Sequence, residues 1–293
     1  MATLSRFRWR YLWLALLALL LVLVLHGCAH YARQQLYLPG SGPVTPPQWE
    51  VTPPGTIFAT TSDGLRLPGY YWPAIAPQRD IVMVLHGRRD NRARMARYVE
   101  HLHDSGLGVL VASYRGYNEN PGSPTEAGLI EDARAFYRFA RERAGPNGRV
   151  YVFGHSLGGA VAIQLAAREP LDGVITLGAF TDVGEVAPFY ADPFIPDDWN
   201  SRETLAQVDE PLLFLHGAED TYVTPDQSRA LYAATCSLTA LAIIDGVRHK
   251  PNFHMIRPFI ASWIDALERG GFADLRVVIP GTASWQAKAA CAR

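Results

Sequence analysis

The chain has 293 residues, of which 48% are hydrophobic and 19% are charged, a composition typical of a folded globular protein. The formal net charge of −1 lacks the basic excess typical of nucleic-acid-binding domains, so we expect no nucleic-acid partner. The three cysteines, Cys28, Cys236 and Cys291, form no C-x-x-C pair and no zinc-type spacing, so we expect no metal.

The first 27 residues indicate export or membrane anchoring. Arg6, Arg8 and Arg10 precede residues 12–25, which are all apolar. A helix of that length rises about 21 Å, short of the roughly 30 Å of a bilayer's hydrocarbon core. The run therefore fits the apolar region of a signal peptide better than a stable transmembrane span.

The apolar run ends in "LHGCAH", which resembles a bacterial lipobox. Leu25 stands three residues before Cys28 and Gly27 directly before it, while His26 departs from that motif. The resemblance implies that Cys28 is lipidated and becomes the first residue of an envelope protein. An uncleaved single-pass membrane anchor and simple secretion are the alternatives.

Residues 28–55 are expected to form an extended tether. Six of the sixteen residues from 39 to 54 are proline, which fixes φ and removes a backbone donor. We expect the main folded domain to follow over residues 56–269, with a C-terminal tail at 270–293. If Cys28 is lipidated, Cys236 and Cys291 could pair in an oxidising compartment and tie down this tail.

The central part of the chain alternates apolar runs with helical patterns. The runs include "DIVMVLHG", "GVLVASYRG", "RVYVFGHS", "GVITLGAF", "PLLFLHG" and "TALAIIDGV". Continuous apolar character is typical of strands buried on both faces of a parallel sheet. The pattern therefore predicts a single α/β domain. One intervening helix is expected to begin with Ser123 as its cap, in a capping box with Glu126, and to end at Gly145.

The most specific motif is "VYVFGHSLGGA", which has the form G-x-S-x-G at Gly154, Ser156 and Gly158. It lies between a predicted strand and a predicted helix, where a sharp turn would expose the serine hydroxyl. Glycines two residues before and two after remove the Cβ atoms that would clash in such a turn. The context predicts that Ser156 is a catalytic nucleophile.

A serine nucleophile needs a base, and that base needs an orienting acid. In the chain order serine, acid, histidine, Asp220 follows a later strand and His249 a still later one. Asp182, Asp245 and Glu219 are competing acids, and His254 is a competing base. We expect Asp220 and His249 to complete the triad.

Backbone amides must also stabilise the developing oxyanion. We expect these from Leu157, at the start of a helix, and from Arg88, after the tight turn at Gly87. The tripeptide Leu-His-Gly occurs three times, at His26, His86 and His216. We expect a targeting role for the first copy and structural roles for the other two histidines, so none of the three would transfer a proton.

With these motifs in place, the chain from about residue 36 to residue 267 resembles the α/β-hydrolase superfamily. The similarity is greatest to its small-lidded serine hydrolases, which include lysophospholipase-like and protein-depalmitoylating esterases. It rests on "VLHG", "SYRGYNENPGSPTEAGLIEDARAFYRF", "GHSLGG", "LHGAEDTYV" and "GVRH". The resemblance implies the nucleophile Ser156, the acid Asp220, the base His249 and oxyanion amides at Arg88 and Leu157, with no cofactor and no metal.

We therefore expect a membrane-associated serine hydrolase that cleaves a carboxylic ester or thioester. A transacylase or peptidase with the same triad, or a catalytically silent binding protein, are alternatives. The sequence "RRDNR" after Gly87 departs from the family pattern, and Arg88, Arg89 and Arg92 there would favour an anionic ester. Neutralisation by Asp90 is the competing interpretation. The resemblance also implies a small lid at residues 181–209. Its aromatic residues could line an acyl site or pack the lid itself: Phe189, Tyr190, Phe194 and Trp199.

Overall fold

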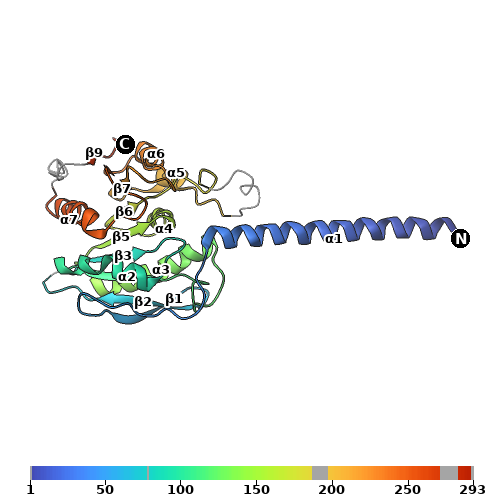
Figure 1. Cartoon of the computed structure of the whole chain (residues 1–293), viewed down its shortest axis with the longest axis horizontal. Helices are drawn as coiled ribbons and strands as arrows, with labels where there is room; N and C mark the ends of the chain where they lie inside the picture. Colours follow the sequence, from blue (N-terminus) through green and yellow to red (C-terminus); the bar gives the residue numbers. More distant parts are fainter. Residues whose placement is uncertain (1, 78, 187–196, 271–282, 292–293) are drawn as a thin grey trace.

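The computed structural model describes residues 2–77, 79–186, 197–270 and 283–291 (Figure 1). Within these residues one sheet contains nine strands in the order β1-β2-β4-β3-β5-β6-β7-β8-β9. Neighbours from β4 to β8 are parallel, whereas β1, β2 and β9 at the edges pair antiparallel. The strands are β1 (Gly55–Thr60), β2 (Arg66–Trp72), β3 (Ile81–Leu85), β4 (Gly108–Val111), β5 (Val150–His155), β6 (Gly173–Leu177), β7 (Leu212–Gly217), β8 (Thr239–Ile244) and β9 (Ala283–Lys288).

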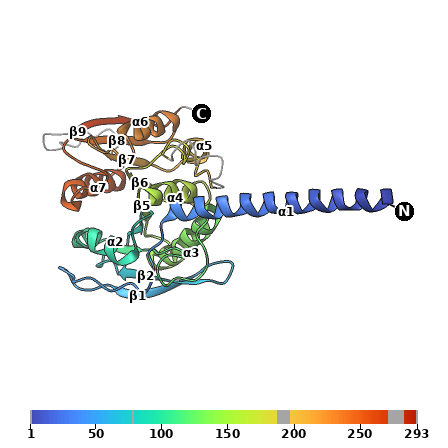
Figure 2. The same ribbon diagram turned by 45° about the vertical axis from the view of Figure 1, so that its right-hand side comes forward.

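Helices cover both faces of the sheet (Figures 1 and 2). α2 and α7 pack on one apolar core, and α3, α4 and α6 pack on the other. The helices are α1 (Ala2–Tyr37), α2 (Arg92–Val99), α3 (Glu126–Ala144), α4 (Leu157–Ala166), α5 (Ser201–Thr204), α6 (Pro225–Ala234) and α7 (Phe253–Glu268), with 3-10 turns η1 (Glu100–Ser105) and η3 (Leu205–Gln207). The predicted α/β class, a mostly parallel sheet flanked by helices, is confirmed.

The central strands are buried along their whole length, as their apolar sequences predict. Every residue of β3, β5, β6, β7 and β8 is buried. A strand between two helical layers has no solvent-facing side, so alternation of apolar and polar residues is absent. The carboxyl ends of these strands meet at one edge, where the turns after β3, β5, β7 and β8 come together.

The predicted start of α3 is wrong by two residues. Thr125 is the cap, because its Oγ1 accepts a hydrogen bond from the backbone N–H of Gly128 at 3.0 Å. Glu126 does not close a capping box. Its carboxylate instead accepts from the backbone N–H of Trp199 at 3.0 Å, and this tertiary contact overrides the local pattern.

The expected tether is not a free linker. Its first ten residues continue α1, and the proline-rich part lies against the domain. Trp49 packs edge-on against Tyr70 and Trp72, with ring centroids 5.6 and 5.4 Å apart. The Trp72 Nε1–H donates to the carbonyl of Thr52 at 2.6 Å. Proline favours the extended form, and Trp49 supplies the apolar contact that holds this form on the surface.

Part of the expected C-terminal tail belongs to the sheet. β9 pairs with β8 from Thr239–Lys288 to Ile244–Ala283. A disulfide joins Cys236 to Cys291, with the two Cα atoms 5.0 Å apart. β9 has the sequence "ASWQAK", which lacks a continuous apolar run. An edge strand is less buried than a central strand and does not need such a run, so the sequence pattern did not predict this strand.

Candidate active site

Ser156 occupies the sharp turn between β5 and α4. Its backbone has φ 54° and ψ −118°, a strained conformation for a residue with a side chain. A Cβ atom on Gly154 would lie 2.1 Å from the carbonyl oxygen of Gly158, and one on Gly158 would lie 2.2 Å from that of Leu85. Both positions therefore require glycine, which is the physical basis of the G-x-S-x-G spacing.

Asp220 and His249 contact one another at the ends of β7 and β8. His249 Nδ1 lies 2.6 Å from Asp220 Oδ2. The other carboxylate oxygen accepts the backbone N–H groups of Tyr222 and Val223 at 2.9 and 3.1 Å. Burial alone would raise the pKa of Asp220, but hydrogen bonds from His216 and His249 hold that pKa well below its usual value. The structure thus gives His249 an ionised carboxylate partner.

The competing residues lie elsewhere. Glu219 and Asp245 are exposed, and Asp182 accepts the backbone N–H of Glu185 at 3.0 Å. His254 is exposed in the first turn of α7, with its ring 5.3 Å from that of His101. The geometry therefore favours the pair Asp220 and His249 over these alternatives.

Ser156 and His249 line one cavity of about 400 Å³. Its apolar wall consists of Leu36, Leu157, Phe180, Val186 and Val223. Its charged cluster consists of Arg88, Arg89, Asp90, Arg94 and Lys250. A concave, largely apolar site with a few polar groups is typical of pockets for small organic ligands.

The two residues expected to supply oxyanion amides flank Ser156 in this cavity. Leu157 is the first residue of α4, where backbone N–H groups lack intrahelical acceptors. Arg88 follows Gly87, whose hypothetical Cβ would lie 3.4 Å from Ser156 Cβ and 3.1 Å from His155 Nδ1. The turn after β3 therefore lies directly against the serine turn, as an oxyanion site requires.

Neither buried histidine of the Leu-His-Gly tripeptides is placed to transfer a proton. His86 Nδ1 donates to the carbonyl of Gly87 at 2.9 Å, and burial lowers its pKa to about 4. His216 contacts the Ser228 hydroxyl at 2.6 Å, the Val223 carbonyl at 2.8 Å and the Asp220 carboxylate at 3.2 Å. His216 thus holds the Asp220 carboxylate in place, a contact that spacing alone did not reveal.

His155 also supports the site from behind. Its Nε2–H donates to the backbone carbonyl of His249 at 3.1 Å. Burial, together with the neighbouring His249, lowers the pKa of His155 to about 3. His155 is therefore neutral at physiological pH, and it links the serine turn to the loop that carries His249.

The charged cluster carries more positive than negative groups. Asp90 pairs with Arg94 at 3.1 Å and with Lys250. Arg88 donates to the carbonyl of Gln35 at 3.3 Å rather than to a carboxylate. The expected contribution of Arg92 is wrong, because Arg92 is buried and pairs with Glu119. Sequence reasoning missed Arg94 and Lys250, which reach the cavity from α2 and from the residue after His249.

The described parts of the predicted lid contribute unequally. Val186 lines the cavity, whereas Trp199 is fully buried in the core and its Nε1–H donates to Tyr37 Oη at 3.2 Å. Trp199 therefore packs in the core rather than lining the cavity. Phe189, Tyr190 and Phe194 lie outside the described residues.

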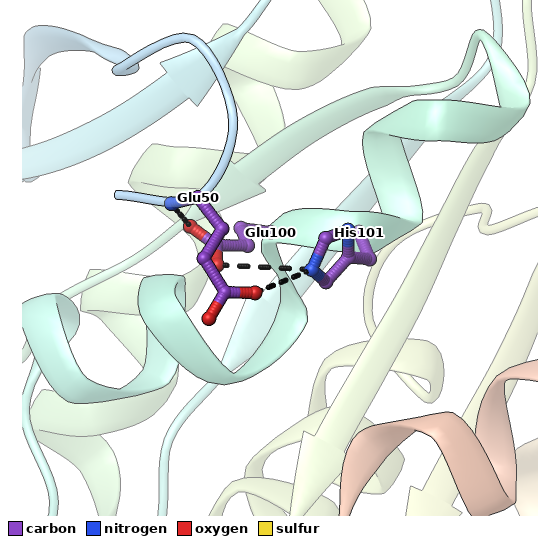
Figure 3. A group of neighbouring side chains, drawn as sticks. All are labelled: Glu50, Glu100 and His101. Carbon is purple, nitrogen blue, oxygen red and sulfur yellow. Dashed lines mark hydrogen bonds and ion pairs between the residues drawn. The ribbon is translucent and has the colours of Figure 1, made fainter. Parts of the chain in front are cut away.

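Glu50, Glu100 and His101 form a group of potential metal ligands (Figure 3), and none of the three lines the cavity. Ligand atoms of Glu50, Glu100 and His101 lie within 4.8 Å of one another. However, the guanidinium of Arg97 pairs with both carboxylates, and His101 Nε2 contacts Glu50 at 3.1 Å. The guanidinium of Arg97 therefore already compensates the negative charge of this cluster. Through Glu50 the cluster fastens the proline-rich segment to η1, which carries Glu100 and His101.

Comparisons with known proteins indicate a hydrolase family. The family model described as serine aminopeptidase, S33, matches residues 76–194. An uncharacterized protein of Mycobacterium tuberculosis, Rv2307c, is 35% identical over 226 residues, which cover 74% of this chain and 80% of that protein. The lysophosphatidylserine lipase ABHD12 of Danio rerio is 28% identical over 191 residues, covering 56% of this chain and 49% of the lipase.

Solved structures share the fold. The Pyrococcus furiosus esterase Pf2001 superposes with a TM-score of 0.60 at 19% identity, covering 80% of this chain and 100% of that chain. Est1E of Butyrivibrio proteoclasticus, solved with ferulic acid, gives a TM-score of 0.62 at 16% identity, covering 73% of this chain and 99% of that one.

Proposed function

Because the chain belongs to the α/β-hydrolase superfamily of serine hydrolases, we propose that it cleaves a carboxylic ester or thioester through an acyl-enzyme on Ser156. One observation carries the proposal. A strained serine at a strand-to-helix turn and a histidine held by a buried carboxylate line the same cavity. This is the arrangement that activates a hydroxyl for attack on an acyl carbon.

In the proposed mechanism, Ser156 Oγ attacks the acyl carbon while His249 Nε2 takes the hydroxyl proton. Asp220 keeps the other proton on His249 Nδ1 and stabilises the imidazolium. The backbone N–H groups of Arg88 and Leu157 stabilise the oxyanion. His249 then protonates the leaving group, and a water molecule activated by His249 releases the acid and restores the serine.

We propose that the substrate is an amphiphile with one acyl chain and an anionic head. The apolar wall suits the chain, and the charged cluster has four cations against the single carboxylate of Asp90. Arginine matches phosphate and carboxylate oxygens in a bidentate way. The similarity to proteins named lysophosphatidylserine lipase supports an anionic lysophospholipid.

The enzyme is proposed to act at a membrane. Residues 11–37 of α1 are long and apolar enough to cross a bilayer, and a signal sequence meets the same criterion. Cys28 is a free cysteine within this helix. We retain lipidation at Cys28 as the proposed anchor in a bacterial envelope, with the uncleaved helix as its alternative.

The proposal is tested by ester hydrolysis with Ser156→Ala and His249→Ala, each expected to lose most of kcat while remaining folded. The matched control is His254→Ala, which we expect to keep wild-type turnover. Release of free acid in the presence of an added alcohol would support hydrolysis, and transfer of the acyl group to the alcohol would support a transacylase. Normal turnover by His249→Ala would contradict the assigned base.

A further inference from the structure

The helix α1 has a free part and a part that lies on the catalytic domain (Figures 1 and 2). The side chains of residues 11–27 are exposed, and coverage by the domain begins at Cys28. Ala32 and Tyr37 are buried, and Arg33 and Leu36 are half-buried, whereas Gln34 is exposed. Residues spaced by four lie on one side of a helix, so residues 28–37 form a docked segment with one face on the domain.

Specific polar contacts fix this docked segment. Arg33 Nε pairs with the Asp197 carboxylate at 3.1 Å. Tyr37 accepts the Trp199 indole N–H on its hydroxyl at 3.2 Å and the Tyr117 hydroxyl on its carbonyl at 2.7 Å. Because Tyr37, Tyr117 and Trp199 are fully buried, breaking these contacts would leave buried polar groups unsatisfied.

The same segment reaches the cavity. Leu36 is part of the apolar wall, and the carbonyl of Gln35 accepts the Arg88 guanidinium. The hydroxyl of Tyr117 donates to the Tyr37 carbonyl, and the Tyr117 ring lies 5.0 Å from the ring of His86. His86 directly precedes Gly87 and Arg88, which form the turn expected to supply an oxyanion amide. The last turn of α1 therefore contributes to both the wall and the support of the candidate active site.

The docked segment also fixes how far the cavity lies from the membrane. From Leu25, the end of the apolar run, to Leu36 a helix rises about 17 Å, and from Cys28 it rises about 12 Å. Either anchor, an intact helix or a lipid on Cys28, leaves the docked segment in the mature protein. The cavity is therefore held close to the surface of the bilayer that anchors α1.

We propose that Leu36 determines acyl-chain specificity, and that the docked segment lets a bilayer-resident acyl amphiphile enter the cavity from the membrane that anchors the same helix. The inference rests on the proposed ester hydrolysis and deepens it. The anchor is then a part of the substrate site as well as a means of localisation.

The test uses the full chain in phosphatidylcholine vesicles with 4-nitrophenyl acetate and 4-nitrophenyl hexadecanoate. Leu36→Trp narrows the cavity and Leu36→Ala removes part of its wall. Each is expected to raise KM for the hexadecanoyl ester about tenfold, as expected for loss of apolar contact equivalent to one or two methylenes. In both variants the kcat/KM for the hexadecanoyl ester, relative to that for the acetyl ester, should fall about tenfold. Gln34→Ala, on the exposed side of the same turn, should match wild type on both esters.

Two results separate failure of this inference from failure of the proposed function. If wild type cleaves neither ester, the proposed function is wrong and the inference falls with it. If wild type cleaves both esters but the Leu36 variants match it on both, or lose both equally, Leu36 does not select the chain and the function stands.

Delivery from the bilayer is tested by placing enzyme and hexadecanoyl ester in the same vesicles or in separate ones. The expected initial rate is at least about tenfold higher in the shared vesicles, because lateral encounter replaces transfer through water. Equal rates would overturn entry from the anchoring membrane.

Discussion

Replacement of Asp220 by Asn changes one atom of the carboxylate and tests the proton arrangement of the site. Asp220 Oδ1 accepts two backbone N–H groups, from Tyr222 and Val223. In the variant, the amide oxygen is expected to keep these two bonds, so the amide NH2 faces His249 Nδ1. Because that NH2 group only donates, Nδ1 must accept and the imidazole proton moves to Nε2.

The Nε2 atom could then no longer take the proton of Ser156. The same substitution in the serine-protease triad lowers kcat about 10⁴-fold, equivalent to about 5.5 kcal/mol in the barrier. We expect a loss of similar size here, measured as kcat on a soluble ester with circular dichroism to verify folding. Asp182→Asn is the matched control and should keep wild-type turnover. A loss of less than about tenfold in Asp220→Asn would refute the role assigned to the acid.

Three further predictions concern charge, cross-linking and pH. Arg89→Ala should raise KM for an anionic ester at low salt but leave a neutral ester of equal length unchanged, and high salt should remove the difference from wild type; equal KM values for the two esters in wild type would contradict the charged-cluster proposal. Cys236→Ser should lower the free energy of unfolding by about 2–4 kcal/mol, because the disulfide closes a long loop, whereas Cys28→Ser should leave it unchanged; a denaturant titration measures both. The hydrogen bonds that His101 donates to Glu50 and Asp104 raise the pKa of His101, so its contribution to stability is full below the unfolded value of about 6.5 and is lost as the pH rises through the folded pKa. The Tm of wild type should therefore fall more between pH 6 and pH 8 than the Tm of His101→Gln. Parallel plots of Tm against pH for the two proteins would count against a stabilising ion pair of His101 with Glu50 and Asp104.

The sequence was most informative where one residue type is physically required. Buried parallel strands need continuous apolar runs, and the turn at Ser156 needs glycine at positions 154 and 158 because a Cβ there would meet backbone atoms. The order of strands along the chain then placed Asp220 and His249 at the same edge of the sheet as Ser156.

Contacts between distant segments were not predictable from local pattern. Gln35 and Arg88 are 53 residues apart in sequence, and Asp90 and Lys250 are 160 apart. The apolar run at residues 12–25 did not indicate that α1 continues to Tyr37 or that its last turn lines the cavity at Leu36. A targeting signal and a helix that packs on a domain can share the same apolar composition. The pairing of β9 with β8 likewise depends on tertiary packing rather than on the sequence of β9.

The central claim is that Ser156 is the nucleophile of an acyl-enzyme. Its most direct test is labelling of the full chain with a fluorophosphonate, followed by digestion and mass spectrometry of the modified peptide. We expect one adduct, on Ser156, which is absent in Ser156→Ala and forms much more slowly in His249→Ala. An adduct on another residue, or undiminished labelling of Ser156→Ala, would contradict it.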